Sequence, residues 1–310
     1  MYQSRSRLAL ASALLFSLTG TAQERFRSGI DLVTMDIGAK DRQGRPVASL
    51  RPEDFVVLDN GVPQQIALFS ADGRVPVAVT LLVDTSLSMR GGQIEHAKAA
   101  AAELVDALRP EDLVEVISFN DQPSVQYPLG GDHAAARQAL QNVVAKGPTA
   151  LFETLLFALN DQERARRTRE EDYRDVIVLL SDGENTVGHV RFEDVLEEVR
   201  RSGALVYTIS LPSTEGAHSG APPWQMAQLA FDTGGQAIAV HGGEDLTEVY
   251  RAIAEDVLHL YRVGYVPSPM ARGGDWHRIQ VRVPAKDLVI RARAGYYAPY
   301  LPESESRGAK

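Results

Sequence analysis

Residues 77–89 read VAVTLLVDTSLSM, and this stretch decides the fold. Its first seven residues form an apolar run that is typical of a β-strand covered on both faces. A second run of the same kind, VIVLL, occupies residues 176–180. Each run leads into a polar segment with an aspartate, Asp84 after the first and Asp182 after the second. The pattern therefore predicts buried strands with polar groups at their carboxyl ends.

Helical patterns alternate with these runs and with two similar ones at residues 114–119 and 205–209. Strands and helices that alternate along a chain indicate an α/β fold, here a doubly wound, mainly parallel sheet with helices on both faces. Ligand sites in this architecture lie at the carboxyl ends of the strands. The predicted helices have apolar faces at helical spacing, formed by Ile94, Ala97, Ala101, Leu104 and Leu108, by Phe192, Val195, Leu196 and Val199, and by Leu246, Val249, Ile253, Val257 and Leu260.

The two flanks of this α/β segment predict half-buried strands, because apolar and polar residues alternate along 30–39 and 279–294. Asn60-Gly61 lies between apolar runs at 55–58 and 66–69 and favours a tight hairpin, because both residues tolerate positive φ. Each flank is too short to bury a core alone, so we expect the two to pack together as one small β module. The predicted organisation is β-strands in residues 24–75, an α/β domain in 76–260, further strands in 261–298 and a flexible tail in 299–310.

The first 22 residues have the features of an export signal. Arg5 and Arg7 precede an apolar stretch at residues 8–18, and Gly20 and Ala22 are small residues suited to signal-peptidase cleavage. A bilayer span takes about 20 apolar residues, so this stretch is too short for one; a buried helix is the alternative. Cleavage would take the net charge from −9 to −11. We expect an exported protein, periplasmic or secreted, without an integral membrane span.

The composition excludes several classes of site. The chain of 310 residues has no cysteine, which excludes disulfides, thiolate metal sites and a cysteine nucleophile. Its 41 acidic residues outnumber 32 basic ones, and the basic segment at 164–169 is followed at once by three acidic residues, so we expect a solvated helix end and no nucleic-acid binding. The seven histidines show no paired spacing for a metal, and no Gly-x-Ser-x-Gly nucleophile motif occurs.

Oxygen-bearing side chains cluster in the predicted strand-end loops: Asp84, Ser86 and Ser88 in the first, Thr149 in a loop bent by glycine and proline, and Asp182 in the third. Hard oxygen ligands suit Mg²⁺, or Mn²⁺, better than zinc or copper. With only two carboxylates among the ligands, a bound ion would stay electrophilic, and an open coordination position would capture a carboxylate from another molecule. A chance helix cap is the alternative for Asp-x-Ser-x-Ser alone, but three loops agree.

The order Asp84-x-Ser86-x-Ser88, then Thr149, then Asp182 resembles the metal-ion-dependent adhesion site of von Willebrand factor type A (VWA) domains. The resemblance covers about residues 76–261. It implies that Ser86 and Ser88 bind the metal directly, that Asp84 and Asp182 bind it directly or through water, and that the Thr149 contact changes with conformation.

Two positions depart from this pattern, because Leu87 and Pro148 stand where such loops often have glycine. Neither replaces a ligand, but Pro148 stiffens the Thr149 loop, which weakens the expectation of a conformational switch. The flanks resemble the VWFA-related family abundant in acidobacteria, through the segments LRPEDF at 50–55, LYRVGY at 260–265 and RAGYY at 293–297.

The resemblance implies a Mg²⁺-dependent adhesion or protein-binding module in which an Asp or Glu of a protein partner completes the metal coordination. From the export features of residues 1–22 we expect it to act outside the cytoplasm, and we expect no enzymatic activity. A structural scaffold whose metal ties three loops together is one alternative. A metal-dependent hydrolase is another, but no general base is identifiable beyond the two aspartates themselves. Ser86 has no identifiable histidine partner and is interpreted as a ligand, not a nucleophile. We also expect the loop at 211–223, LPSTEGAHSGAPP, to border the metal and help to select the partner; an ordinary surface loop is the alternative.

Overall fold

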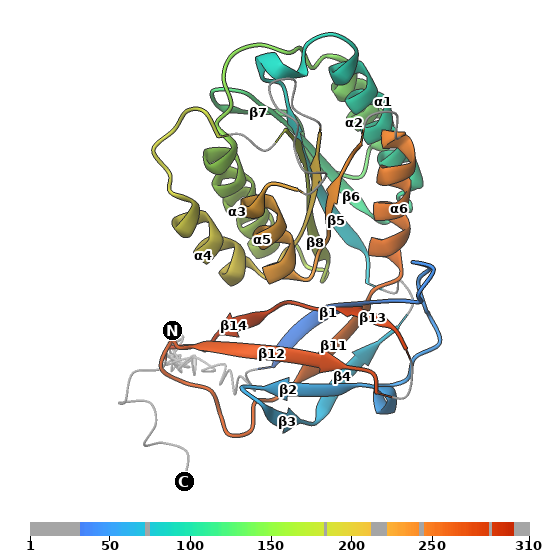
Figure 1. The fold of residues 1–310 in the computed structure, drawn as a ribbon, viewed down its shortest axis with the longest axis vertical. Coiled ribbons are helices and arrows are strands. Elements are labelled where there is room, and N and C mark those ends of the chain that lie inside the picture. Colours follow the sequence, from blue (N-terminus) through green and yellow to red (C-terminus); the bar gives the residue numbers. More distant parts are fainter. Residues whose placement is uncertain are drawn as a thin grey trace, which may run out of the picture. The chain divides into compact units, whose positions relative to one another are not determined.

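The computed structural model describes residues 32–71, 75–182, 185–211, 222–241, 245–284 and 287–300. Its α/β part contains a six-stranded sheet in the order β10-β9-β8-β5-β6-β7. Strands β5, β6, β7 and β8 of this sheet are labelled in Figure 1. Five of the six strands are parallel, and β7 pairs antiparallel with β6 at one edge. The strands are β5 (Val77–Asp84), β6 (Leu113–Phe119), β7 (Pro123–Gly130), β8 (Arg174–Ser181), β9 (Leu205–Ser210) and β10 (Ala237–Ala239).

Helices cover both faces of this sheet (Figure 1). One face carries α1 (Gly92–Ala107), α2 (His133–Gln141) and α6 (Leu246–Leu258), and the other carries α3 (Leu151–Thr168), α4 (Phe192–Ser202) and α5 (Trp224–Thr233). Every residue of β5 and β8 is buried, as the apolar runs predicted, because helices cover the sheet on either side. The predicted α/β fold class, with its mainly parallel sheet between two helical layers, is therefore confirmed.

Strands from the two flanks form two four-stranded sheets, in the orders β13-β1-β11-β4 and β14-β12-β2-β3. One apolar core joins them and draws on both flanks, with Ile37 and Val57 from the first and Val263 and Ile279 from the second. This confirms the predicted β module. Its elements are β1 (Val33–Lys40), a 3-10 turn η1 (Pro52–Asp54), β2 (Val56–Asp59), β3 (Val62–Gln64), β4 (Ile66–Ser70), β11 (Tyr261–Tyr265), β12 (Trp276–Arg282), β13 (Val289–Arg291) and β14 (Gly295–Tyr297).

The predicted hairpin forms, but with a different second strand. Asn60 and Gly61 both have positive φ, 47° and 83°, which suits a two-residue turn. Such a turn pairs Asp59 with Val62, so the strand returning beside β2 begins immediately, as β3. The apolar run expected as the partner is β4, which instead pairs antiparallel with β11 in the other sheet. The sequence-based assignment of this partner is wrong. Pairing β2 with residues 66–69 would need a longer loop, whereas the two-residue turn returns the chain at Val62.

The α/β segment enters and leaves the β module through neighbouring strands. β4 precedes it and β11 follows it, and these two strands pair with Leu68 opposite Gly264. The boundaries proposed from the sequence stay predictions. The expected signal at 1–22, nearly all of the loop at 211–223, and the tail from 301 onward lie outside the described residues. In the part of the chain that is described, no helix is both long and apolar enough to cross a membrane.

Candidate metal centre

The carboxyl ends of β5 and β8 bring two of the predicted ligands to one edge of the central sheet. The register sets Val83 opposite Leu180, so the ends of the two strands lie side by side. The Ser181 hydroxyl donates a hydrogen bond of 2.6 Å to Oδ2 of Asp84. Asp182 is the next residue, and its charge acts on Asp84. Parallel pairing therefore places both aspartates at the same strand ends, as predicted.

Asp84 is a fully buried carboxylate that is held by hydrogen bonds. Its Oδ1 accepts a bond of 2.8 Å from the Ser86 backbone N–H. Burial raises the pKa of Asp84 to about 6; hydrogen bonds from Ser181 and Ser86 oppose this rise, and the Asp182 charge adds to it. Among the described residues, no lysine or arginine forms an ion pair with Asp84. Its surroundings therefore favour a positive charge that neighbouring side chains do not supply.

The two predicted serine ligands lie directly beyond Asp84. Ser86 is buried and Ser88 is exposed, and their Oγ atoms are 2.9 Å apart. Ser86 precedes the short 3-10 turn η2 (Leu87–Met89), but its side chain makes no capping hydrogen bond there. The observed geometry therefore does not support the helix-cap alternative, and the two hydroxyls lie together at the rim of the strand end.

The Thr149 loop is joined to this first loop by backbone hydrogen bonds. Lys146 N–H donates to the Thr85 carbonyl at 2.6 Å, and Leu87 N–H donates to the Gly147 carbonyl at 2.9 Å. Gly147 adopts φ +74°, a conformation that favours glycine. Thr149 itself is buried. The bend predicted from the glycine thus brings the second loop against the first.

The segment after Asp182 is bonded in turn to the Thr149 loop. Thr149 N–H donates to Thr186 Oγ1 at 2.8 Å, and Thr186 N–H donates back to the Thr149 carbonyl at 2.9 Å. Phe152 N–H also donates to Asn185 Oδ1 at 3.2 Å. Three loops that are distant in sequence are therefore tied together at one edge of the sheet, with the five predicted residues on them.

Sequence reasoning missed Glu153, which fixes the third loop from the first turn of α3. Its Oε1 accepts hydrogen bonds from the N–H groups of His189 and Val190, at 2.6 and 3.1 Å, and its Oε2 is buried without a partner. Gly188 has φ +118°, and a Cβ there would collide with the Glu153 carboxylate. An acid in a first helical turn is ordinarily explained by the helix dipole, so no sequence pattern indicated this role. Ser181, by contrast, could have been found, because it ends the VIVLLS strand beside Asp182.

Comparisons with known proteins agree with the fold. The family model described as von Willebrand factor type A domain matches residues 78–252. The inter-alpha-trypsin inhibitor heavy chain H4 of Sus scrofa is 24% identical over 251 residues, which are 76% of this chain and 26% of that protein. The protein sll0103 of Synechocystis sp. is 34% identical over 121 residues, 38% of this chain and 27% of its own. The chain thus spans about a quarter of the length of these relatives.

Among solved structures, the protein titled von Willebrand factor type A from Catenulispora acidiphila aligns with a TM-score of 0.51. The alignment covers 89% of this chain and 75% of that one at 14% sequence identity, a likeness that concerns the fold alone.

Proposed function

The chain belongs to the von Willebrand factor type A domain family, and on that premise we propose that it is a protein-binding module whose strand-end site holds a divalent metal ion. VWA domains commonly act as protein-interaction or adhesion modules. The proposed ligands are Asp84, Ser86, Ser88, Thr149 and Asp182.

The observation that carries this proposal is the state of Asp84. A carboxylate that is buried, close to a second carboxylate and without a basic partner among the described residues is costly, because its charge is neither solvated nor neutralised. A divalent cation between Asp84 and Asp182 would neutralise both. The adjacent hydroxyls of Ser86 and Ser88 add hard oxygen donors, so this donor set fits Mg²⁺ or Mn²⁺.

The same donor set supports a carboxylate of the partner as the group that is recognised. When bound, the ion would act as a local positive charge with affinity for a carboxylate oxygen. The net charge of −9 repels acidic partners at long range, so attraction of an Asp or Glu side chain would depend on the metal. We further propose that the module acts outside the cytoplasm, from the export features of residues 1–22.

A binding role is favoured over hydrolysis by the hydroxyl arrangement. A serine nucleophile needs an adjacent general base. Ser86 Oγ instead lies against Ser88 Oγ, which suits two neutral donors to one ion. The scaffold alternative, in which the metal only ties the loops together, shares the same ligands and differs in having no open position for a partner.

The site is tested by thermal unfolding of the chain in EDTA, Mg²⁺ and Mn²⁺. We expect metal to raise the unfolding midpoint, since a ligand at a hundred times its Kd stabilises the folded state by about 2.7 kcal/mol. Asp84→Ala and Asp182→Ala should abolish the rise. Asp106→Ala, which removes an exposed carboxylate on α1, should leave it intact. A midpoint that responds equally to metal in all three variants would refute the site.

A second measurement separates adhesion from the scaffold alternative. Acetate is titrated against the Mn²⁺-loaded protein while water-proton relaxation is monitored. Displacement of metal-bound water by acetate indicates an open position that accepts a carboxylate. Metal-dependent stability without any effect of acetate would replace the adhesion proposal with the scaffold.

A further inference from the structure

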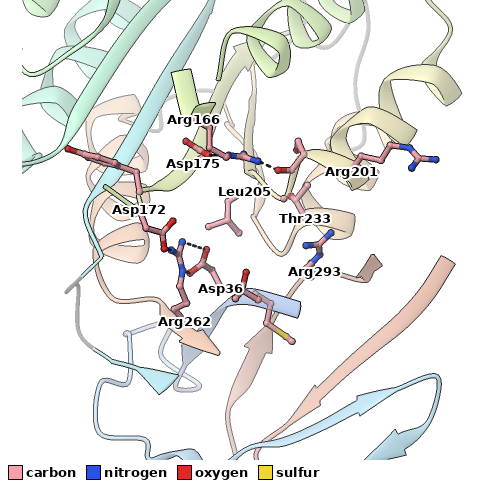
Figure 2. A pocket seen from close by; sticks show the side chains of 14 residues that line it. Asp36, Arg166, Asp172, Asp175, Arg201, Leu205, Thr233, Arg262 and Arg293 are labelled. Atoms are coloured by element: carbon pink, nitrogen blue, oxygen red, sulfur yellow. Dashed lines mark hydrogen bonds and ion pairs between the residues drawn. The ribbon is translucent and has the colours of Figure 1, made fainter. Parts of the chain in front are cut away.

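A polar cavity of about 290 Å³ lies at the amino ends of β8 and β9, whereas Asp84 is at the carboxyl end of β5. Figure 2 shows side chains that line the cavity. Ligand pockets typically begin at about this volume. The α/β domain contributes Arg166 and Asp175 to its wall, and the β module contributes Asp36, Arg262 and Arg293.

Arginines outnumber the buried carboxylates around this cavity. Asp175 is paired with both Arg166 and Arg169, each at 2.7 Å. Asp36 is paired with Arg174 at 2.9 Å and with Arg262 at 3.1 Å.

The pairing at Asp36 is strong enough to offset its burial. Burial opposes ionisation, but Arg174 and Arg262 nevertheless hold the pKa of Asp36 below its usual range. Each buried aspartate therefore neutralises one of the two guanidinium groups that it contacts. Two more exposed carboxylates offset part of the remaining positive charge: Asp172 pairs with Arg262 at 2.7 Å, and Glu163 pairs with Arg166 at 3.2 Å.

Arg293 adds a positive charge whose hydrogen bonds within the described residues go to carbonyl groups and not to a carboxylate. Its Nε donates to the Gly295 carbonyl at 2.7 Å and its Nη2 to the Arg200 carbonyl at 2.9 Å. Within the described ranges it forms no ion pair. Burial lowers the pKa of Arg293, although the charge of Asp36 and the hydroxyls of Tyr265 and Tyr296 oppose this. In Figure 2, Arg293 extends toward the cavity beside Thr233, whereas the Arg201 guanidinium points away.

We propose that this cavity binds a phosphate group, free or as the monoester of a small molecule, with Arg293 as its principal contact and Arg166 and Arg262 beside it. Beyond its two bonds to carbonyls, Arg293 keeps the Nη1 N–H groups and one Nη2 N–H as donors within the described residues, and such paired donors match the oxygens of a phosphate. The local excess of arginine contrasts with the net charge of −9 of the whole chain, and a bound phosphate would offset it. This site is separate from the metal site and does not depend on the function proposed for it.

The test measures the thermal midpoint of the full chain in EDTA, with inorganic phosphate compared against sodium chloride of equal ionic strength. Glycerol 3-phosphate is a parallel arm that distinguishes a monoester from free phosphate. We expect phosphate or its monoester to raise the midpoint in a saturable way, and chloride not to do so. If both compounds match chloride, the proposal is overturned.

A pair of substitutions at Thr34 locates the site without disturbing the core, because Thr34 is exposed and lines the cavity. Thr34→Glu should weaken phosphate binding at least tenfold through charge repulsion. Thr34→Gln introduces a side chain of nearly the same size as glutamate but without its charge, and it should retain the phosphate affinity within about twofold. Equal binding by the two variants would place any phosphate elsewhere and overturn the proposal.

Arg293→Met tests the principal contact, with Arg137→Met on α2 as its control, since Arg137 pairs with Asp106 far from the cavity lining. We expect Arg293→Met to lose the stabilisation by phosphate and Arg137→Met to keep it. Full stabilisation in folded Arg293→Met would contradict the assignment. Should that variant not fold, the Thr34 pair decides the question.

Discussion

The two ends of the central sheet treat buried aspartates in opposite ways. At the amino ends, Asp36, Asp112 and Asp175 all pair with arginines, and Asp112 is fully buried against Arg109. At the carboxyl ends, Asp84 is equally buried but is held by hydrogen bonds from Ser86 and Ser181, with the charge of Asp182 nearby. At the amino ends the chain supplies arginines as counter-charges to its aspartates, and at the carboxyl ends Asp84 has no such counter-charge among the described residues.

This difference teaches that burial alone does not identify a functional carboxylate. What distinguishes Asp84 from Asp175 is the sign of the nearest charge, because an arginine stabilises the ionised form and a second carboxylate destabilises it. The ion pairs of the amino end therefore contribute to the stability of the folded chain, whereas Asp84 at the carboxyl end lacks this stabilisation, as expected for the proposed cation site. Four predictions follow from this contrast.

The largest effect is expected from breaking a pair at the amino end. Asp36→Ala leaves Arg174 buried without its carboxylate, and removing one partner of a buried ion pair costs about 3–5 kcal/mol of unfolding free energy. Chemical denaturation measures this loss. Asp172→Ala is the control: Asp172 is 83% exposed although it pairs with the same Arg262 that contacts Asp36, so its removal should cost less than about 1 kcal/mol. Similar losses in the two variants would contradict the assigned role of burial.

An Asp→Asn substitution should change the unfolding free energy in opposite directions at the two ends of the sheet. In EDTA, Asp84→Asn removes a buried charge that faces Asp182 and should stabilise the protein by about 1 kcal/mol or more. Asp175→Asn weakens two arginine pairs and should destabilise it by about 1–3 kcal/mol. Denaturation midpoints of both variants test this. Destabilisation by both would erase the contrast.

A carboxylate midway along the sheet predicts a pH dependence. Glu115 on β6 is buried, and its pKa is raised to about 8, first by burial and then by Asp161, although a hydrogen bond from Thr80 opposes the rise. The folded state therefore binds a proton that the unfolded state releases near pH 4.5, so this stabilisation is full below that pH and is lost as the pH rises toward 8.

The measurement is the unfolding free energy between pH 5 and 9 for the unmodified chain and Glu115→Gln. The contribution of one group is at most about 1.4 kcal/mol per pH unit. Glu115→Gln should flatten the fall with rising pH. An unchanged slope would mean that other groups cause it.

The smallest effect is expected at Glu153, which accepts hydrogen bonds from the backbone of the third loop. Glu153→Ala removes the acceptor for two backbone N–H groups, and we expect Mn²⁺ affinity to fall by about tenfold, the low end for groups that support metal ligands, because no proposed ligand is lost. Isothermal titration measures the affinity. Glu163→Ala, on a more exposed part of the same helix, should leave it unchanged. A matching fall in both would show a general effect of helix charge.

The sequence predicted the parts of the molecule that depend on local pattern. The apolar runs located β5 and β8, and the rule that sites lie at carboxyl ends of parallel strands pointed to Asp84, Ser86, Ser88, Thr149 and Asp182, whose role as ligands stays a prediction. The pairing of β4 with β11 was missed, because apolar alternation specifies a strand but not its neighbour. The pairs of Asp36 with Arg174 and Arg262 join residues 138 and 226 positions apart, and no local pattern carries that information.

The pairing of the flanks has a consequence for biosynthesis. β1 and β4 both pair with β11, and Thr34 faces Gly264 across 230 residues of chain. Contacts of such long sequence separation form slowly, because a large loop must close first. During translation the α/β domain can fold while β1 and β4 still lack their common neighbour, and unpaired strand edges invite association with other chains. A nascent chain of this protein would therefore depend most on chaperones after its largest domain has emerged and before residues 261–265 are available.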